Sequence, residues 1–170
     1  KRERWQLTLN QAFDDVIYAC SLPRSNDLPE GEHTWIHDEM IDAYTELHAQ
    51  GLAHSVEVWD ENGQLVGGLY GLRLGGIYFG ESMFHQASNA SKLAFWGLMR
   101  LCEQSHITLV DCQLPNDHLM SLGATTLPRV DFLAQLDTLI STRSVPWQKH
   151  THKPLAVALL DTPDPWQLKL

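Results

Sequence analysis

Two turn signals most constrain the fold of this chain, because each separates segments with the sequence pattern of β-strands. Asn62-Gly63 joins HSVEVWD (54–60), in which polar and apolar residues alternate, to QLVGGLYGL (64–72), which is mostly apolar. Gly75-Gly76 then precedes IYFG (77–80). Asn and Gly tolerate the positive φ angles of tight hairpins, and a period of two is typical of strands. The pattern predicts an antiparallel meander of three strands.

Helical periodicity flanks this meander on both sides. Residues 9–21 and 37–51 carry apolar residues at helical spacing, with a polar loop over 22–33 between them. Residues 88–105 form the longest helical pattern, and Ser88 or Asn89 is placed to cap it. The apolar segment ITLVDCQ (107–113) then predicts a buried strand, which makes a β-α-β crossover and an α/β fold class. Further predicted elements are helices over 115–122 and 130–139 and a last strand, PLAVALL, over 154–160.

Composition narrows the class of protein. The 170 residues are 44% hydrophobic and 19% charged, which is enough to build one domain with a core. The formal net charge of −9 argues against a nucleic-acid-coating protein but leaves room for a small local basic site. Three cysteines without CxxC spacing predict neither a disulfide framework nor a zinc site, so a reducing cytosol is the expected compartment. No apolar run approaches the roughly 20 residues of a membrane span.

Polar residues interrupt the predicted core at the ends of strands. Glu81 follows the third strand of the meander within FGESMF (79–84). Asp111 and Gln113 lie two residues apart on the strand 107–113, so we expect them on one face. Asn116 follows at the carboxyl end of that strand, where open α/β sheets place their sites. Taken alone, the pattern leaves both a catalytic site and a capping or salt-bridging role open.

Other constellations give weaker signals. Nine histidines include the pair His150-x-His152, but no third ligand stands at a recognised spacing, so we predict no metal site. Ser82, His85 and Asp111 could be written as a triad, yet no GxSxG elbow surrounds the serine. The glycines of 67–76 fit no nucleotide-binding loop, and they predict bulges or close backbone approach instead. Trp35 and Met83 belong to the core by default and gain interest only beside Glu81 and Asp111.

Seven stretches of the chain carry a resemblance to a known family. They are TWI (34–36), AYTELHAQGLAHSVEVW (43–59), LVGGLYG (65–71), FGESMF (79–84), NASK (89–92), DCQLPNDHLMSLGA (111–124) and PRVDFL (128–133). In this order the sequence resembles the leucyl/phenylalanyl-tRNA–protein transferases over about residues 7–140. The resemblance implies a GCN5-type N-acyltransferase-like fold without coenzyme A, with a mixed, mostly antiparallel sheet flanked by helices.

The resemblance also implies an activity and roles for residues. Leucine or phenylalanine, and methionine less well, would pass from aminoacyl-tRNA to proteins that begin with arginine or lysine, marking them for N-degron proteolysis in the cytoplasm. Asp111 and Gln113 match the pair proposed to relay a proton, and Glu81 matches the acid at the donor's α-amino group. Matching site motifs place Trp35, Ser82, Met83 and Asn116 in substrate binding. No cofactor, metal or membrane is implied.

Two departures from the family and two rival functions remain at this stage. The family carries a small amino-terminal domain and a basic tRNA-contacting segment, whereas this chain begins at Lys1 without a methionine, so we expect residues 1–170 to be the catalytic domain of a cut chain. The tail after Arg143 matches no motif. One rival is a coenzyme-A-dependent N-acetyltransferase. Such an enzyme needs a pyrophosphate-binding loop before the helix, and the segment at that place, FHQASNAS (84–91), does not contain one. The other is a non-catalytic module that binds basic amino-terminal peptides.

Overall fold

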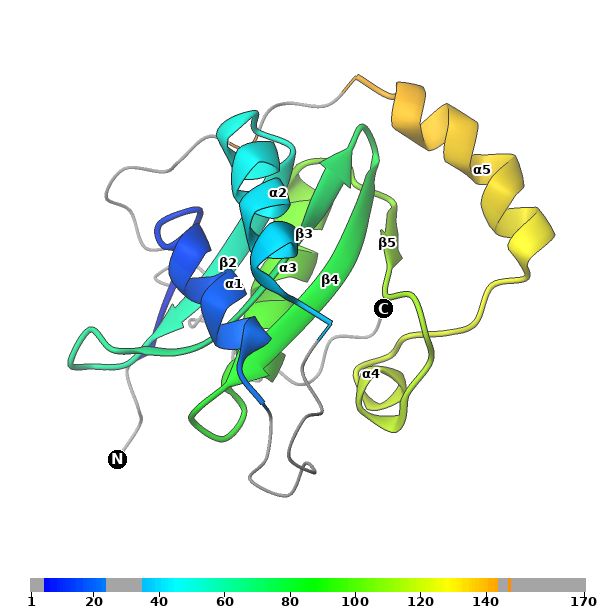
Figure 1. The fold of residues 1–170 in the computed structure, drawn as a ribbon. Coiled ribbons are helices and arrows are strands. Elements are labelled where there is room, and N and C mark those ends of the chain that lie inside the picture. Colours follow the sequence, from blue (N-terminus) through cyan, green and yellow to red (C-terminus); the bar gives the residue numbers. More distant parts are fainter. Residues whose placement is uncertain (1–4, 24–34, 144–146, 148–170) are drawn as a thin grey trace.

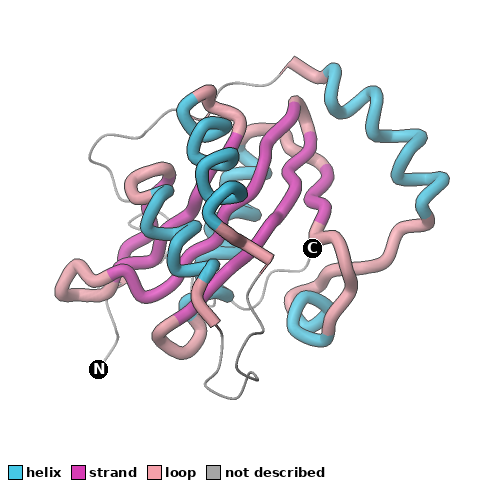
Figure 2. The backbone as a smooth tube through the Cα atoms, viewed as in Figure 1, coloured by secondary structure: helices cyan, strands magenta, loops and turns pink. Residues whose placement is uncertain are grey.

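Five strands form one sheet in the order β1-β2-β3-β4-β5, drawn in Figures 1 and 2. The computed structural model describes residues 5–23, 35–143 and 147. Its strands are β1 (Gln6–Leu9), β2 (Ala53–Trp59), β3 (Leu65–Leu74), β4 (Ile77–His85) and β5 (Leu109–Asp111). Strands β1 to β4 pair antiparallel, and β5 pairs parallel with β4. The predicted meander is therefore confirmed as β2, β3 and β4.

Helices cover both faces of this sheet. Helices α1 (Phe13–Ser21) and α2 (Asp38–Ala49) lie in front of it in Figure 1, and α3 (Ala90–Gln104) lies behind. Because α3 connects β4 to the parallel β5, the predicted β-α-β crossover and the α/β class, a mixed and mostly antiparallel sheet flanked by helices, are confirmed. The remaining helices, α4 (Asp117–Ser121) and α5 (Arg129–Ser141), follow β5. The predicted strand 154–160 and the pair His150-x-His152 lie outside the described residues.

Two apolar clusters explain why the central strands are buried on both sides. One cluster lies between the sheet and α3 and includes Leu7, Val56 and Leu98. The other lies under α1 and α2 and includes Phe13 and Tyr70. Burying such side chains contributes roughly 1.5–3 kcal/mol each before the entropy cost of folding. In the described residues, no helix is long and apolar enough to cross a membrane.

The glycines of β3 allow close approach, as predicted. A Cβ on Gly67 would lie 2.5 Å from the Cβ of Ala90, so this glycine lets α3 pack against the sheet. A Cβ on Gly71 would lie 2.1 Å from the carbonyl oxygen of Phe79, at a bulge between Tyr70 and Gly71. Both positions require the absence of a side chain. Their role is steric.

Several local predictions were wrong for identifiable reasons. Residues 6–9 pair with β2 as a strand, so the first helix begins at Phe13 and not at residue 9. In the first hairpin only Gly63 adopts a positive φ, because Asp60 Oδ1 accepts the N–H groups of Asn62 (2.9 Å) and Gln64 (2.8 Å) and closes a longer loop. Asn89 occupies the N-cap position of α3 without a side-chain hydrogen bond.

Candidate active site

The site forms where strands β4 and β5 stop pairing. Their parallel register ends at Phe79 and Asp111, although β4 continues to His85. Glu81 therefore lies inside β4, beyond the part of β4 that pairs with β5. The prediction that it follows a strand was wrong. Strand β5 is a half-buried edge strand of three residues, not the buried strand predicted over 107–113. Beyond Phe79, β4 still pairs with β3 on its other side, and the edge that faced β5 is open to other partners.

Gln113 spans the interval between the two strands. Its Nε2 donates to the carbonyl oxygen of Gly80 and to Glu81 Oε2, both at 3.1 Å. Its backbone N–H donates to Asp111 Oδ1 at 2.8 Å. Gln113 has left the strand with a φ of +64°, so the expectation that it shares a strand face with Asp111 was wrong. The turn nevertheless brings Glu81, Gln113 and Asp111 together.

Tyr44 extends this group from helix α2, and sequence reasoning did not single it out. Burial and the hydrogen bond from the Tyr44 hydroxyl to Glu81 raise the pKa of Tyr44 well above its ordinary value. The phenol therefore stays protonated and donates to the carboxylate at neutral pH. Its ring meets the Tyr70 ring edge to face, with centroids 5.3 Å apart. Both tyrosines stand in the stretches AYTELHAQG and LVGGLYG, which was the only sequence signal available for them.

Tyr70 adds a polar group that has no partner in the described part of the chain. Its side chain is fully buried, and its hydroxyl makes no hydrogen bond there. A buried hydroxyl without a partner is costly, at about 1–3 kcal/mol. Tyr70 also lines the cavity described next.

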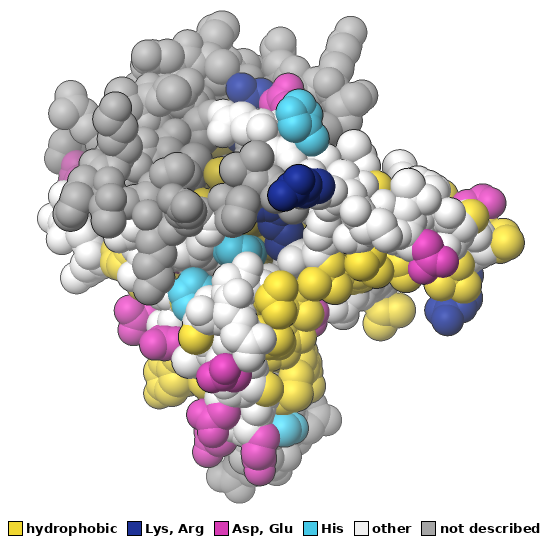
Figure 3. Space-filling view, turned by 90° about the horizontal axis from the view of Figure 1, so that it is seen from above, with side chains coloured by type: hydrophobic (Ala, Val, Ile, Leu, Met, Phe, Trp, Pro, Cys, Tyr) yellow, Lys and Arg dark blue, Asp and Glu magenta, His cyan; other side chains and the backbone are white. Residues whose placement is uncertain are grey.

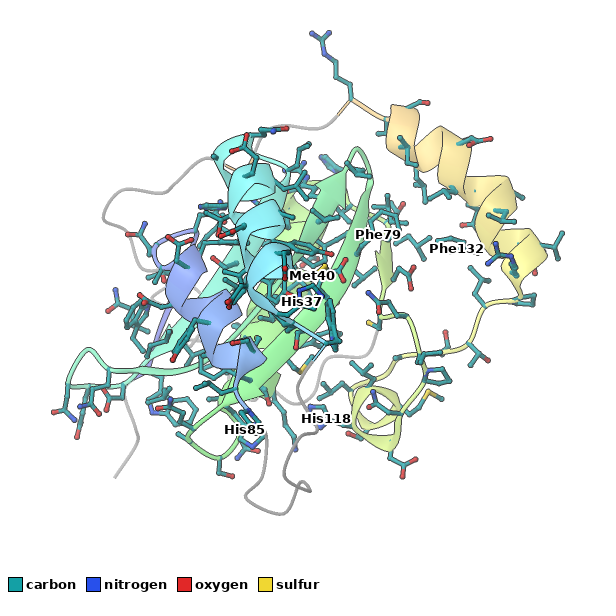
Figure 4. The ribbon with its side chains drawn as sticks, viewed as in Figure 1. His37, Met40, Phe79, His85, His118 and Phe132 are labelled. Carbon is teal, nitrogen blue, oxygen red and sulfur yellow. The ribbon has the colours of Figure 1, made fainter. Side chains whose placement is uncertain are left out.

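A cavity of about 690 Å³ opens beside Glu81. Most of its lining is apolar and comes from β3, β4, α3, β5 and α4, with Leu69, Met83, Phe84, Phe95, Leu98, Val110 and Leu119. Ser82 and Asn116 also line it, as do His85 and His118, which Figure 4 labels. Asn116 Oδ1 accepts the N–H of Leu119 at 2.9 Å and so caps α4 at the cavity. The arrangement suits a large apolar group with a polar end near Glu81.

A second, wider groove of about 1500 Å³ opens on the other side of the polar group. Asp111 and Gln113 line this groove, whereas Glu81 lines the first cavity. The two spaces share Phe95, Val110, Cys112 and Leu119, so they adjoin at β5. The hydrogen bond between Gln113 and Glu81 therefore crosses from one space to the other. Two molecules could meet at this point.

Trp35 does not share this location. The structure places it just before α2 with half of its surface exposed, and it lines neither space. Cys112 lies between the two spaces, but burial and then the Asp111 carboxylate raise the pKa of its thiol. A protonated thiol is a weak nucleophile. No group of three His, Cys, Asp or Glu side chains among the described residues is placed to hold a metal ion.

The fold and this site define an α/β domain whose polar group sits between two diverging strands, next to an apolar cavity. Residues 1–137 match the family described as leucyl/phenylalanyl-tRNA protein transferase, and the chain belongs to that family.

Curated relatives carry the same description. The leucyl/phenylalanyl-tRNA–protein transferase of Psychrobacter arcticus is 78% identical over 165 residues, which cover 97% of this chain and 62% of the relative. That of Psychrobacter cryohalolentis is 74% identical over 177 residues, covering 99% of this chain and 65% of the relative. The chain thus spans less than two thirds of the length of these relatives.

Two solved structures of similar shape are N-acetyltransferases. An aminoglycoside 6′-N-acetyltransferase from Acinetobacter baumannii aligns with a TM-score of 0.49 at 14% identity, covering 88% of this chain and all of that chain. The glucosamine-6-phosphate N-acetyltransferase of Arabidopsis thaliana aligns with a TM-score of 0.47 at 13% identity, covering 74% of this chain and 95% of that chain. We draw no function from either likeness.

Proposed function

We propose that this chain is the catalytic domain of an aminoacyltransferase that moves leucine or phenylalanine, and methionine less well, from aminoacyl-tRNA to proteins with amino-terminal arginine or lysine. The observation that carries the proposal is the hydrogen-bonded group Glu81, Gln113 and Asp111 at the junction of two spaces, in a chain of this family. Transfer between two substrates requires such a junction.

The donor fits the first cavity. Glu81 is placed to hold the α-ammonium group of the aminoacyl ester, and Met83 and the apolar lining receive its side chain. An apolar pocket separates side chains that differ by one methylene by only about 1–3 kcal/mol. We therefore expect Leu, Phe and Met to be accepted, with smaller side chains at a disadvantage. Ser82 and Asn116 line the same cavity and are proposed to contact the donor.

The acceptor approaches from the second groove. Its neutral α-amine attacks the ester carbonyl carbon, a C–N bond forms, and the bond to the 3′-oxygen of the terminal adenosine breaks. The amine nitrogen loses a proton, and the departing 3′-oxygen gains one. Gln113 Nε2 is committed to Gly80 and Glu81, which leaves Gln113 Oε1 as an acceptor for the amine's N–H. The Asp111 carboxylate stabilises the positive charge that develops on nitrogen.

In this scheme, most of the rate enhancement comes from holding the donor ester and the acceptor amine in the right geometry. The aminoacyl ester is already activated, so holding the two substrates together replaces a bimolecular encounter. The reaction needs no cofactor for the same reason. The proposed donor is a cytoplasmic molecule, so we place the reaction in the cytoplasm, where the new amino-terminal residue would mark the acceptor for N-degron proteolysis. Trp35 keeps its proposed role in substrate binding, at the exposed entry to α2.

The test is to incubate the chain with leucyl-tRNA and a peptide that begins with arginine, and to follow peptide extension by mass spectrometry. We expect extension by the wild type and losses of at least about tenfold in kcat/KM for Asp111→Asn and Glu81→Gln. Asp42→Asn changes an exposed acid of α2 in the same way and serves as the control. Extension in both site variants at the wild-type rate contradicts the roles. Acetylation of the peptide from acetyl coenzyme A, without leucyl transfer, contradicts the function.

A further inference from the structure

Strand β5 is the last strand of the sheet and has a partner on one side only within the described residues. The N–H of Thr108 donates to the carbonyl oxygen of Gly76, on the β4 side, at 3.1 Å. Because N–H groups alternate sides along a strand, those of Leu109 and Asp111 face away from β4. An exposed strand edge of this kind is a template for another extended segment. Both residues line the wide groove.

The opposite wall of this groove comes from the segment that leads into helix α5, and it mixes apolar residues with polar ones such as Thr126 and Arg129. Leu127 and Phe132 line it, and Figure 4 labels Phe132. Helix α5 itself has no buried residue, and its start stands apart from the sheet in Figure 1, whereas its last turn contacts the β3–β4 connection, where Leu139 O accepts the N–H of Gly76 at 2.8 Å. Figure 3 shows hydrophobic side chains gathered along the hollow between this helix and the rest of the molecule. The groove thus offers backbone partners on one side and apolar contact on the other.

We propose that the acceptor polypeptide binds in this groove as an added strand, antiparallel to β5, with its α-amine at Asp111 and Gln113. The inference rests on the proposed function, which requires an amino terminus at that point. Asp111 is the last residue of β5, so a chain whose first residue lies there must run back toward Leu109. The strand direction therefore follows from the position of the polar group.

Charge and sequence tolerance favour this occupant over others. The carboxylate of Asp111, which accepts the backbone N–H of Gln113, stands at the end of the groove where the basic first residue of an acceptor would lie. Backbone hydrogen bonds to a strand edge give affinity without reading side chains. Such binding lets an enzyme select on the first residue and accept many different sequences after it. A second copy of this chain, or its own segment 154–160, would instead close the groove to acceptors.

The test uses a six-residue arginine-start peptide and four versions that are N-methylated singly at residues 2 to 5. The unmodified peptide must be extended first, because failure there contradicts the proposed function and not the binding mode. In an antiparallel pair, alternate N–H groups point at the neighbouring strand. We expect KM to rise at least about fivefold at alternate positions, with kcat unchanged. Equal effects at all four positions, or none, overturn the proposal.

A variant of the strand edge gives a matched comparison. Leu109→Pro removes an N–H that faces the groove and keeps those that face β4. We expect a higher KM for the six-residue peptide and an unchanged KM for arginine amide, which is too short to form a strand. Equal changes for both acceptors overturn the proposal.

Hydrogen exchange in the wild type answers the same question if Leu109→Pro does not fold. The amides of Leu109 and Asp111 should exchange rapidly alone and more slowly with the six-residue peptide. Protection without peptide means that another segment already occupies the edge, and it also overturns the proposal.

Discussion

At the scale of single residues, Gln113 holds an uncommon backbone conformation in order to join two carboxylates. A φ of +64° costs a residue with a side chain about 1 kcal/mol, and glycine adopts it freely. The cost is offset by hydrogen bonds to Gly80 and Glu81. Residues in such conformations often mark functional sites. The strain and the hydrogen bonds can be separated by substitution.

Gln113→Gly is expected to keep the fold and lose activity. Glycine relieves the backbone strain while two exposed hydrogen bonds are lost, so the free energy of unfolding should stay within about 1 kcal/mol of wild type. Peptide extension should fall at least about tenfold in kcat/KM, because the amide that orients Glu81 is gone. Urea unfolding and the transfer assay measure the two effects. His106→Gly, at another positive φ, is the control and should keep full activity. Full activity in Gln113→Gly would remove the amide from the mechanism.

A second prediction for a single residue concerns His54 and the pH dependence of stability. Asn10 Oδ1 accepts the N–H of Ser55 at 3.0 Å, which turns Asn10 Nδ2 toward His54 Nδ1 at 2.9 Å. The ring must then accept, so it is neutral. Burial, followed by the charge of Arg73, lowers the pKa of His54 from 6.5 to about 4.

The sign of the effect on stability follows. The unfolded chain takes up a proton as pH falls through 6.5, while the folded chain does not until about pH 4. The wild type should therefore lose about 3 kcal/mol of stability between these values through this group. In His54→Gln this loss is absent, so the stability difference between the two proteins should narrow on acidification. Urea unfolding at pH 7 and pH 4 measures it, and parallel curves would contradict it.

At the scale of elements, the buried Glu57 of β2 ties the connection between β1 and α1 to the sheet. Its Oε1 accepts from the N–H groups of Gln11 (3.2 Å) and Ala12 (3.5 Å) and from Ser55 Oγ (2.5 Å). Thr8 Oγ1 donates to the other oxygen. Burial outweighs these bonds and raises the pKa of Glu57. One carboxylate thus fixes where the first helix begins.

Two substitutions of Glu57 should separate the effect of its hydrogen bonds on stability from the effect of its ionisation. With a raised folded pKa, the wild type is most stable below the unfolded value of 4.5 and loses stability as pH rises. Glu57→Gln keeps an acceptor for the two amides and does not ionise, so its stability should not fall in this way. Glu57→Ala leaves both amides unpaired and should cost about 2–4 kcal/mol. Urea unfolding from pH 4 to pH 8 measures both, and a pH-dependent loss in Glu57→Gln equal to wild type would refute the assignment.

Element type could be predicted well from the sequence, and element ends poorly. The meander, the helices around it and the crossover follow from periodicity and turn residues, which are local. Strand β1 was missed because its pairing with β2 is made across about fifty residues. Gln113 was wrongly predicted on the strand. The hydrogen bonds that hold it outside the strand join it to Gly80 and Glu81, which lie more than thirty residues away in the sequence, so the local pattern does not show them. Glu81, Asp111 and Gln113 were named as site residues through the family motifs, their hydrogen bonds were not predicted, and Tyr44 and Tyr70 were not singled out.

At the scale of the whole molecule, charge should make the two substrates respond oppositely to salt. The chain carries a net charge of −9 with 12 Lys and Arg residues, so it attracts a basic acceptor and repels the tRNA phosphates. Raising NaCl from about 50 mM to 200 mM shortens the range of these interactions to about 8 Å or less. We expect the KM of an arginine-start peptide to rise and that of leucyl-tRNA to stay level or fall. Leucyl-adenosine, which lacks the polyanion, is the control and should show little change. A steep rise in the KM of leucyl-tRNA with salt would mean that cations of this chain displace counterions from its phosphates, and it would contradict the prediction.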